Sequence, residues 1–302
     1  MAEVAIETKK MTKRFGLVTA VDKADMHVTR GAIYGLIGKK GAGKSTMLRM
    51  LAGLQKPTAG SYEVFGTEMN GKCAGGARRR VGIVTEGWFT VPGWKLEDAV
   101  KRQCRLLGIP GKEKAEEVLG ITGLKKYAGT RIEKLPEEKR ISARIAFALC
   151  GSPDLLLLDD VFAGGNLQQK AETEELLKRL NRDFNITIVV TAEEPEALEE
   201  IADSFGIMDH GELRKELSAD EMRALHETAL RVRVTDVNAL ARVLVEQSLR
   251  HRILDGETAE IYGKPHITGL VTALAKEACE VISMEERTVQ TESLLAALGG
   301  EV

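Results

Sequence analysis

The glycine-rich run from Gly35 to Thr46 constrains the fold more than any other part of the chain. It reads GLIGKKGAGKST, follows a short apolar segment and opens a segment with helical periodicity, so it fits the phosphate-binding P-loop in letters and in context. Glycines let such a loop turn tightly and point backbone N–H groups at phosphate oxygens, and the N-terminus of the next helix adds partial positive charge. The alternative is a glycine-rich strand-to-helix turn that binds nothing.

The P-loop supplies most of the candidate ligands for a nucleotide. In this pattern Lys44 is placed for the β and γ phosphates, and Ser45 for Mg²⁺. Phe15 is a candidate stacking platform for adenine, or alternatively a hydrophobic plug at a sheet edge. The predicted nucleotide-binding residues are Phe15, Gly38, Lys39, Lys40, Gly41, Ala42, Gly43, Lys44, Ser45 and Thr46.

Composition excludes several classes of protein. At 302 residues the chain predicts two domains, and a net charge of −2 argues against a nucleic-acid partner. The cysteines form no CxxC pair and the histidines show no metal-ligand spacing, so we expect free thiols in a reducing cytosol and no structural metal. The N-terminus has no signal-peptide pattern and the apolar runs are too short to span a bilayer. Any spanning helices would therefore belong to another chain.

Two continuous apolar runs predict the centre of an α/β fold. Leu155–Leu158 precedes two aspartates, and Ile186–Val190 precedes a threonine. Continuous rather than alternating apolar runs indicate strands buried on both faces, as in a parallel sheet flanked by helices. Ligands bind at the carboxyl ends of such strands. The residues expected to meet there are Lys44, Asp159, Asp160, Thr191 and Ala192.

The N-terminal residues predict a second, half-buried set of strands. Partial alternation indicates strands over Val4–Thr8 and Ala24–Val28, with Lys13–Gly16 as the intervening turn.

A helical insertion is expected at about residues 86–152. Leu96–Leu107 and Lys112–Leu119 are amphipathic helical stretches with no strand pattern between them. Several of the chain's few aromatic residues gather at the entrance to this insertion, between Trp88 and Trp94. Such a cluster suits a partner surface, although a local mini-core is the alternative.

The C-terminal part predicts a small α+β domain. A linker helix is expected over Ser218–Glu227, followed by strand, helix, two strands, helix and strand, which is the ferredoxin-like βαββαβ order. A closing helix is expected over Thr291–Leu298. The expected βαββαβ elements are Leu230–Val234, Asp236–Gln247, Arg250–Leu254, Glu257–Tyr262, His266–Ala278 and Glu280–Met284. With no catalytic constellation, we interpret this domain as a regulatory or dimerisation module.

Taken together and in chain order, these motifs and expected elements resemble the nucleotide-binding subunit of an ABC transporter, most closely the bacitracin-resistance and lantibiotic-immunity exporter branch. The resemblance covers residues 4–215 and implies a P-loop NTPase domain with a helical subdomain, ahead of a C-terminal domain at 216–302. It implies ATP and Mg²⁺ as cofactors, a second nucleotide-binding domain, and a permease docking near Trp88–Trp94 at the cytoplasmic face of a membrane. It rests on Lys13-Arg14-Phe15-Gly16, the P-loop, Leu135 with its following helix, Pro153–Asp159 and Asp209–Leu213.

The chain departs from the family pattern where catalysis occurs. Glu86 stands for the family's Gln, Pro136-Glu137-Glu138 for the Ser-Gly-Gly signature, Asp160 for the catalytic Glu, Asn166 for the D-loop Asp and Ala192 for the switch His. The resemblance therefore implies an intact binding half and an altered catalytic half.

Each departure has a chemical consequence. Pro136 has neither hydroxyl nor N–H, and two glutamates add anions where another chain's γ-phosphate would sit. Asp160 is one methylene shorter than a glutamate base, whereas Glu86 still offers an oxygen to Mg²⁺, beside Ser45 and Asp159. We expect ATP binding with weak or absent hydrolysis. The alternatives are a non-hydrolysing structural or regulatory subunit, and a slow homodimeric transport ATPase using Asp160.

The two lysines of the P-loop allow two interpretations. Lys39 and Lys40 add positive charge that attracts nucleotide. In a head-to-tail homodimer they would instead face Glu137 or Glu138 of the other chain and favour association without ATP.

Overall fold

The computed structural model describes residues 3–71, 74–85, 93–225, 228–262 and 265–288. Contacts divide the chain into two compact units, Met1–Ala219 and Asp220–Val302. The sequence placed the boundary after residue 215. The first unit extends past that point because the last strand of its main sheet pairs with its neighbour as far as Ser204 and Ser218.

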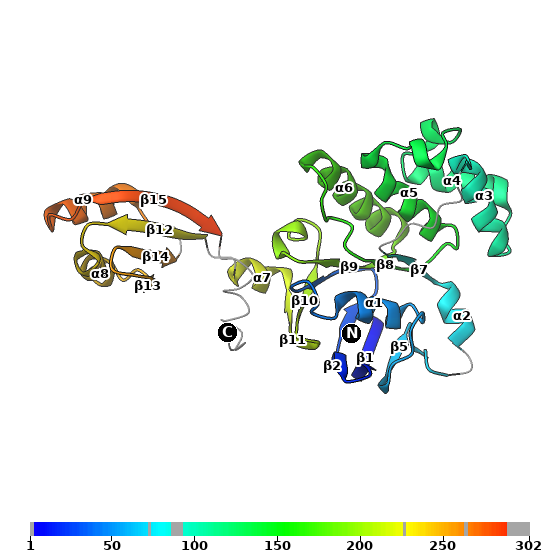
Figure 1. Cartoon of the computed structure of the whole chain (residues 1–302), viewed down its shortest axis with the longest axis horizontal. Helices are drawn as coiled ribbons and strands as arrows, with labels where there is room; N and C mark the ends of the chain where they lie inside the picture. The colour runs from blue at the N-terminus through cyan, green and yellow to red at the C-terminus, as the bar shows by residue number, and fades with distance from the viewer. Residues whose placement is uncertain (1–2, 72–73, 86–92, 226–227, 263–264, 289–302) are drawn as a thin grey trace. The chain divides into compact units, whose positions relative to one another are not determined.

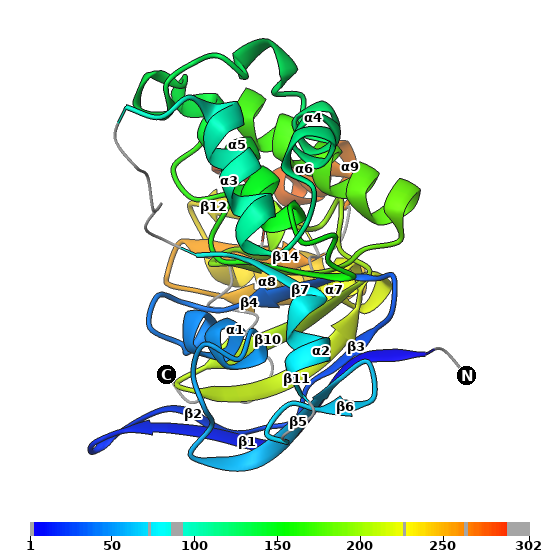
Figure 2. The ribbon, with the colours of Figure 1, turned by 90° about the vertical axis from the view of Figure 1, so that its right-hand side faces the viewer.

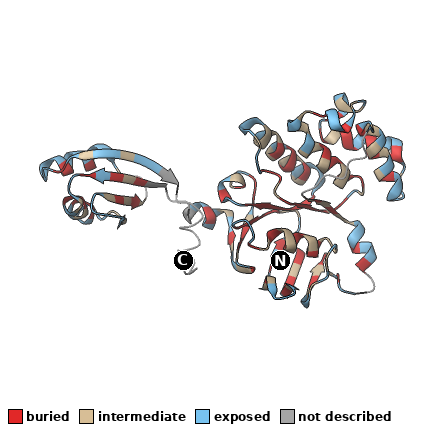
Figure 3. Ribbon diagram, in the orientation of Figure 1, coloured by how far each residue is buried: buried red, intermediate tan, exposed pale blue. Residues whose placement is uncertain are grey.

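The first unit is built on a largely parallel sheet, as the continuous apolar runs predicted. Its strands run in the order β11-β10-β4-β9-β8-β7, and only the edge strand β11 is antiparallel to its neighbour. Every residue of β4, β8 and β9 is buried (Figure 3). The strands are β4 (Ile33–Ile37), β7 (Val81–Val84), β8 (Leu155–Leu158), β9 (Thr187–Ala192), β10 (Ser204–Asp209) and β11 (Glu212–Ser218).

A second, antiparallel sheet lies at the N-terminal end of the chain, with β1 at its centre. The expected turn at Lys13–Gly16 is wrong, because β1 continues to Phe15, which pairs with Val18 across a two-residue turn containing Gly16 at φ +58°. The expected strand at Ala24–Val28 is split between two strands that both pair with β1. The strands are β1 (Val4–Phe15), β2 (Val18–Ala24), β3 (His27–Thr29), β5 (Ala59–Val64) and β6 (Thr67–Glu68).

The helices of the first unit form layers on both sides of the parallel sheet. Figures 1 and 2 both place α3 to α6 on one side of it, and α1 with the antiparallel sheet on the other. No helix in the described part of the chain is long and apolar enough to cross a membrane. The helices are α1 (Lys44–Leu51), α2 (Ala74–Arg79), α3 (Leu96–Leu106), α4 (Gly111–Ile121), α5 (Glu137–Leu149) and α6 (Leu167–Phe184), with 3₁₀ turns η1 (Lys125–Tyr127), η2 (Ile132–Lys134) and η3 (Pro195–Ala197).

Helix α1 is held by a core shared between the two sheets. Its apolar residues Met47, Leu48, Met50 and Leu51 are fully buried there, together with side chains of β1, β8 and β9. Complete burial of a leucine or methionine side chain stabilises by roughly 1.5–3 kcal/mol. The helix that follows the P-loop is therefore fixed by packing along its length, which leaves its N-terminus available to a ligand.

The second unit has the predicted βαββαβ order. Its four strands form one antiparallel sheet in the order β13-β14-β12-β15, which brings the first and last strands together. The expected closing helix at Thr291–Leu298 lies outside the described residues. The elements are β12 (Thr228–Val234), α8 (Val237–Glu246), β13 (His251–Ile253), β14 (Thr258–Tyr262), α9 (Ile267–Lys276) and β15 (Val281–Thr288), preceded by α7 (Ala219–Leu225).

Candidate functional site

The P-loop connects a buried strand to the N-terminus of a helix. Strand β4 ends at Ile37, and Gly43 is the N-cap of α1 with φ +104°. A Cβ at Gly43 would lie 2.3 Å from the carbonyl oxygen of Ala20, so only glycine fits. No side chain caps α1 and no acidic residue lies in its first turn. The free N–H groups and the helix dipole are therefore left for an external anion.

Lys44 is folded back onto the loop. The side chain is buried, and its Nζ donates to the carbonyl oxygens of Gly38 and Lys39, the second at 3.1 Å. Burial lowers the pKa of Lys44, while Glu193, Asp160 and Asp159 oppose this by favouring the charged form. The ammonium is thus poorly solvated and close to three carboxylates, so a phosphate anion would improve its surroundings.

Asp159 is the centre of a buried hydrogen-bond cluster. Its Oδ1 accepts from the hydroxyls of Ser45 and Thr191, each at 3.0 Å, although Ser45 is 114 residues away in sequence. Only 2% of Asp159 is exposed, and its Oδ2 is buried without a hydrogen-bond partner in the described structure. A buried carboxylate with an unused oxygen needs a cation or a donor. Ser45 and Asp159 therefore fit the Mg²⁺ site that the sequence predicted.

Lys44, Ser45, Asp159 and Thr191 line one cavity of about 240 Å³. It contains most of the predicted site, because the carboxyl ends of β8 and β9 meet the P-loop here. Gly38, Lys39 and Ala42 belong to the same loop but do not line the cavity. The lining residues are Ala20, Lys40, Gly41, Gly43, Lys44, Ser45, Thr46, Asp159, Asp160, Thr191 and Glu193.

Phe15 and Glu86 were also predicted as site residues. Phe15 does not line this cavity. Phe15 ends β1, is 48% exposed, and has the ammonium of Lys13 5.0 Å from its ring centre. Its stacking on adenine stays a prediction. Glu86 lies outside the described residues, as do Trp88, Phe89, Val91 and Pro92 of the predicted partner surface; Trp94 is half-buried, with the Arg102 guanidinium 5.1 Å from its ring.

The sequence interpretation missed one carboxylate. Glu193 follows directly after β9 and lines the cavity, where it acts on Lys44 more strongly than Asp160 does. Its position just past the end of a buried parallel strand was the available signal. Asp160 adopts φ +53°, and its N–H donates to the Thr191 hydroxyl at 2.8 Å. Besides Asp159, the predicted Mg²⁺ ligand, two further carboxylates therefore line the cavity with the P-loop.

The position before Glu193 carries no polar side chain. Ala192 is 2% exposed, and its carbonyl oxygen accepts from the N–H of Gly38 at 3.3 Å. This bond joins β9 to the start of the P-loop. A methyl group here has no means of binding a phosphate oxygen.

The start of α5 contains two exposed glutamates. Pro136 is the N-cap, with φ −52° and ψ 146°, and this extended ψ makes Glu137 the first helical residue. Glu137 and Glu138 occupy the first turn, where their negative charges interact favourably with the positive end of the helix dipole. Lys139 pairs with Glu172 and so joins α5 to α6.

Asn166 has a structural role at the start of α6. Its side chain accepts from the N–H of Gln169 at 2.8 Å, and the Gln169 side chain accepts from the N–H of Asn166 at 2.9 Å. This reciprocal pair is a capping box. Uncharged side-chain amides therefore accept hydrogen bonds from backbone N–H groups at the start of α6.

The sequence is similar to those of known ATP-binding transport proteins. The family model described as "ABC transporter" matches residues 21–163. The bacitracin transport ATP-binding protein BcrA of Bacillus licheniformis is 33% identical over 80% of this chain and 78% of its own length. The methionine import ATP-binding protein MetN of Streptomyces coelicolor is 32% identical over 72% of this chain and 65% of its own length.

Solved structures show the same fold. The ATP-binding cassette MJ0796, in a dimeric post-hydrolysis state bound to ADP and Pi, has a TM-score of 0.64 at 22% identity and covers 71% of this chain and 98% of its own. CbiO1 from Clostridium perfringens, part of a cbiONQ transporter complex, has a TM-score of 0.67 at 18% identity and covers 82% of this chain and 96% of its own.

Proposed function

Because this chain belongs to the ATP-binding proteins of ABC transporters, we propose that it serves an exporter of peptides or drugs, in transport or immunity, and hydrolyses ATP weakly or not at all. Similarity to a bacitracin transport protein over 80% of the chain supports a role in transport of a peptide or drug. Similarity to methionine importers makes the direction of transport a point for experiment.

The observation that carries the proposal is the contrast between an intact P-loop site and an altered signature. Lys44 and the uncapped start of α1 suit the phosphates, and Ser45 with Asp159 would hold Mg²⁺, with Glu86 proposed as a further ligand. When bound, Mg²⁺ neutralises phosphate charge. At the start of α5, however, Glu137 and Glu138 are exposed. The repulsion between two like charges about 4 Å apart, such as a glutamate and a phosphate, is around 1 kcal/mol in water and about 4 kcal/mol at an effective dielectric near 20.

The residues near the γ-phosphate position also argue for slow chemistry. A general base must come within roughly 2.6–3.2 Å of the attacking water, and Asp160 is one methylene shorter than a glutamate. Ala192 offers no hydrogen bond, and the Glu193 carboxylate adds negative charge near Lys44. These features favour a chain that binds ATP and turns it over slowly, if at all.

Two alternatives are each favoured by particular residues. A slow homodimeric transport ATPase is favoured by Asp160, which lines the same cavity as Lys44 and Ser45. A non-hydrolysing structural or regulatory subunit is favoured by Pro136 and the two glutamates at the start of α5.

The partners follow from the same family. We propose a membrane permease docking near Trp88–Trp94, at the cytoplasmic face of the membrane, and a second nucleotide-binding domain, identical or not. The presence of a dimeric cassette among the matching structures supports the second domain. The C-terminal βαββαβ domain is proposed as a regulatory or dimerisation module.

The deciding experiment measures ATP binding and ATP turnover of the chain co-purified with its permease. The control variants are Lys44→Ala, which removes the P-loop cation, and Asp160→Asn, which removes the carboxylate without changing its size. Binding without turnover supports the proposed subunit. Turnover that Asp160→Asn abolishes supports the slow ATPase instead, and absence of ATP binding contradicts both. Transport into or out of proteoliposomes then gives the direction.

A further inference from the structure

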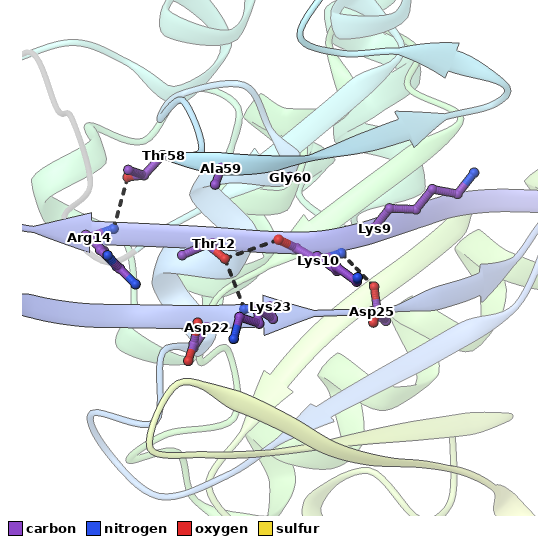
Figure 4. A pocket seen from close by; sticks show the side chains of 10 residues that line it. All are labelled: Lys9, Lys10, Thr12, Arg14, Asp22, Lys23, Asp25, Thr58, Ala59 and Gly60. Carbon is purple, nitrogen blue, oxygen red and sulfur yellow. Dashed lines mark hydrogen bonds between the residues drawn. The ribbon is translucent and has the colours of Figure 1, made fainter.

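A second hollow, separate from the P-loop cavity, lies on the antiparallel sheet. It has a volume of about 720 Å³, is bordered by β1, β2 and the start of β5, and shares no lining residue with the P-loop cavity. Figure 4 shows its side chains. The charged ones are Lys9, Lys10, Arg14, Lys23, Asp22 and Asp25. Four cations thus surround a space that contains two carboxylates.

The backbone is distorted on both sides of this hollow. Lys10 in β1 has φ +48° and Lys23 in β2 has φ +46°, in the left-handed region that a lysine rarely adopts. The register of β1 against β2 shifts between Met11, which pairs with Ala24, and Lys13, which pairs with Val21. Lys10 directly precedes this shift on β1, and Lys23 lies within it on β2. Such bulges change the direction of side chains that would otherwise alternate between the faces of a sheet. Here two lysines are directed to one hollow.

A buried threonine holds both distorted positions. Thr12 is 5% exposed; its hydroxyl donates to the carbonyl oxygen of Lys10 and accepts from the N–H of Lys23, each at 3.1 Å (Figure 4). One side chain therefore couples the backbone of the two lysines across the strands. The exposed side chains of Lys10 and Lys23 therefore start from backbone positions that a single buried hydroxyl holds.

The charges of the hollow are incompletely balanced within the described structure. Asp25 accepts from the N–H of Lys10 at 2.6 Å, and Lys9 pairs with Glu7, which lies outside the hollow, at 3.3 Å. The side chains of Lys10, Arg14 and Lys23 make no ion pair or hydrogen bond to any described residue. Asp22 has a buried Oδ1 without a partner. The hollow therefore offers three exposed cationic side chains to an anion.

We propose that this hollow binds a phosphomonoester or hydrogen phosphate, with Lys10, Arg14 and Lys23 contacting the phosphate oxygens. A free metabolite and a lipid headgroup carry the same chemistry. The proposal is independent of ATP hydrolysis, because it uses none of the residues around Lys44.

The first test measures binding of inorganic phosphate and glycerol 3-phosphate by calorimetry, using the full chain with Lys44→Ala so that the P-loop cation does not contribute. Adding Lys10→Gln with Lys23→Gln should weaken binding at least tenfold. The matched control is Lys112→Gln with Lys215→Gln, two exposed lysines outside the hollow, and it should leave binding unchanged. Equal weakening in both pairs overturns the proposal, as does an absence of saturable binding both here and with the phosphatidic acid vesicles described below.

A second test separates a built site from a diffuse positive surface. Thr12→Val keeps every charge but removes the hydroxyl that couples the two lysines, and should weaken phosphate binding about fivefold; Thr12→Ser should restore it. Unchanged affinity in a folded Thr12→Val variant contradicts the built site, with folding checked by the thermal midpoint. If Thr12→Val does not fold, the lysine pair above remains decisive.

A third measurement identifies the source of the phosphate. The chain is mixed with vesicles of phosphatidylcholine, with and without phosphatidic acid, and sedimented. Binding to phosphatidic acid vesicles that Lys10→Gln with Lys23→Gln abolishes, without binding of glycerol 3-phosphate, supports a lipid headgroup. Binding of glycerol 3-phosphate without vesicle binding supports a free metabolite, and binding to neither overturns the proposal.

Discussion

Helices α1 and α5 begin in opposite ways. Helix α1 has glycine at its N-cap, no capping side chain and no acidic residue in its first turn. Helix α5 begins after Pro136 with Glu137 and Glu138. Both helices have the same partial positive charge at this end. In α1 that charge is left to an external anion, whereas in α5 the chain supplies its own anions.

The comparison shows how a helix start can gain local stability and lose a ligand site. Acidic residues in the first turn stabilise a helix by about 0.3–1 kcal/mol each. The same charges repel a phosphate. Helix α6 is an intermediate case, because Asn166 and Gln169 satisfy its first N–H groups without a charge. Of these three starts, that of α1 is the one that suits an anion.

The largest expected effect is at α1. Lys44→Ala should weaken ATP binding by about 2–3 kcal/mol, or roughly 30- to 150-fold in Kd, because it removes a charge-assisted hydrogen bond to phosphate. Fluorescence titration with a labelled ATP analogue measures this. Lys112→Ala, at an exposed site on α4, is the control and should leave the Kd unchanged. Equal affinity in both variants would contradict the site.

The next effect is at α5. Glu137→Gln with Glu138→Gln should strengthen ATP-dependent association of two chains by about tenfold, because repulsion between these glutamates and the γ-phosphate is removed. Stability should fall by about 0.3–1 kcal/mol for each lost charge. Sedimentation with and without ATP, and urea unfolding, measure the two changes. Glu116→Gln with Glu175→Gln, two exposed glutamates on α4 and α6, is the matched control, and association that changes equally in both pairs would falsify the explanation.

A smaller effect is expected at α6. Asn166→Ala should cost about 1 kcal/mol of stability, since it removes the side-chain oxygen that accepts from the N–H of Gln169 in the capping box. Thermal unfolding and ATP titration measure this variant, whose ATP affinity should stay at the wild-type value. Asn166→Asp keeps an acceptor and should keep the stability. An Ala variant as stable as Asn166→Asp would show that the cap does not contribute.

The smallest effect concerns association without ATP. If Lys39 or Lys40 of one chain faces Glu137 or Glu138 of another, reversing both glutamates to lysine should weaken nucleotide-free dimers by about 0.2–1 kcal/mol, the range for exposed pairs. Sedimentation equilibrium at low and high salt measures this, because salt screens such pairs. Dimerisation that is independent of both the variant and the salt would remove this explanation.

Several features follow from the sequence alone because they depend on local patterns. The P-loop letters require a strand before them and a helix after them, and the run Leu155–Leu158 requires a strand buried on both faces. The βαββαβ order of the second unit follows from the alternation of short periodic segments. The turn at Lys13–Gly16 was wrong because the pairing of Phe15 with Val18 extends β1 beyond its local pattern.

Other features were decided only by the tertiary structure, because they join segments that are distant in sequence. The two hydroxyls on Asp159 come from the P-loop and from β9, and Glu193 reaches the neighbourhood of Lys44 only because β4 and β9 are adjacent strands. The coupling of Lys10 to Lys23 through Thr12 depends on the register between β1 and β2. Position at a strand end indicates which groups lie near one another, but the individual hydrogen bonds are decided by packing and strand pairing.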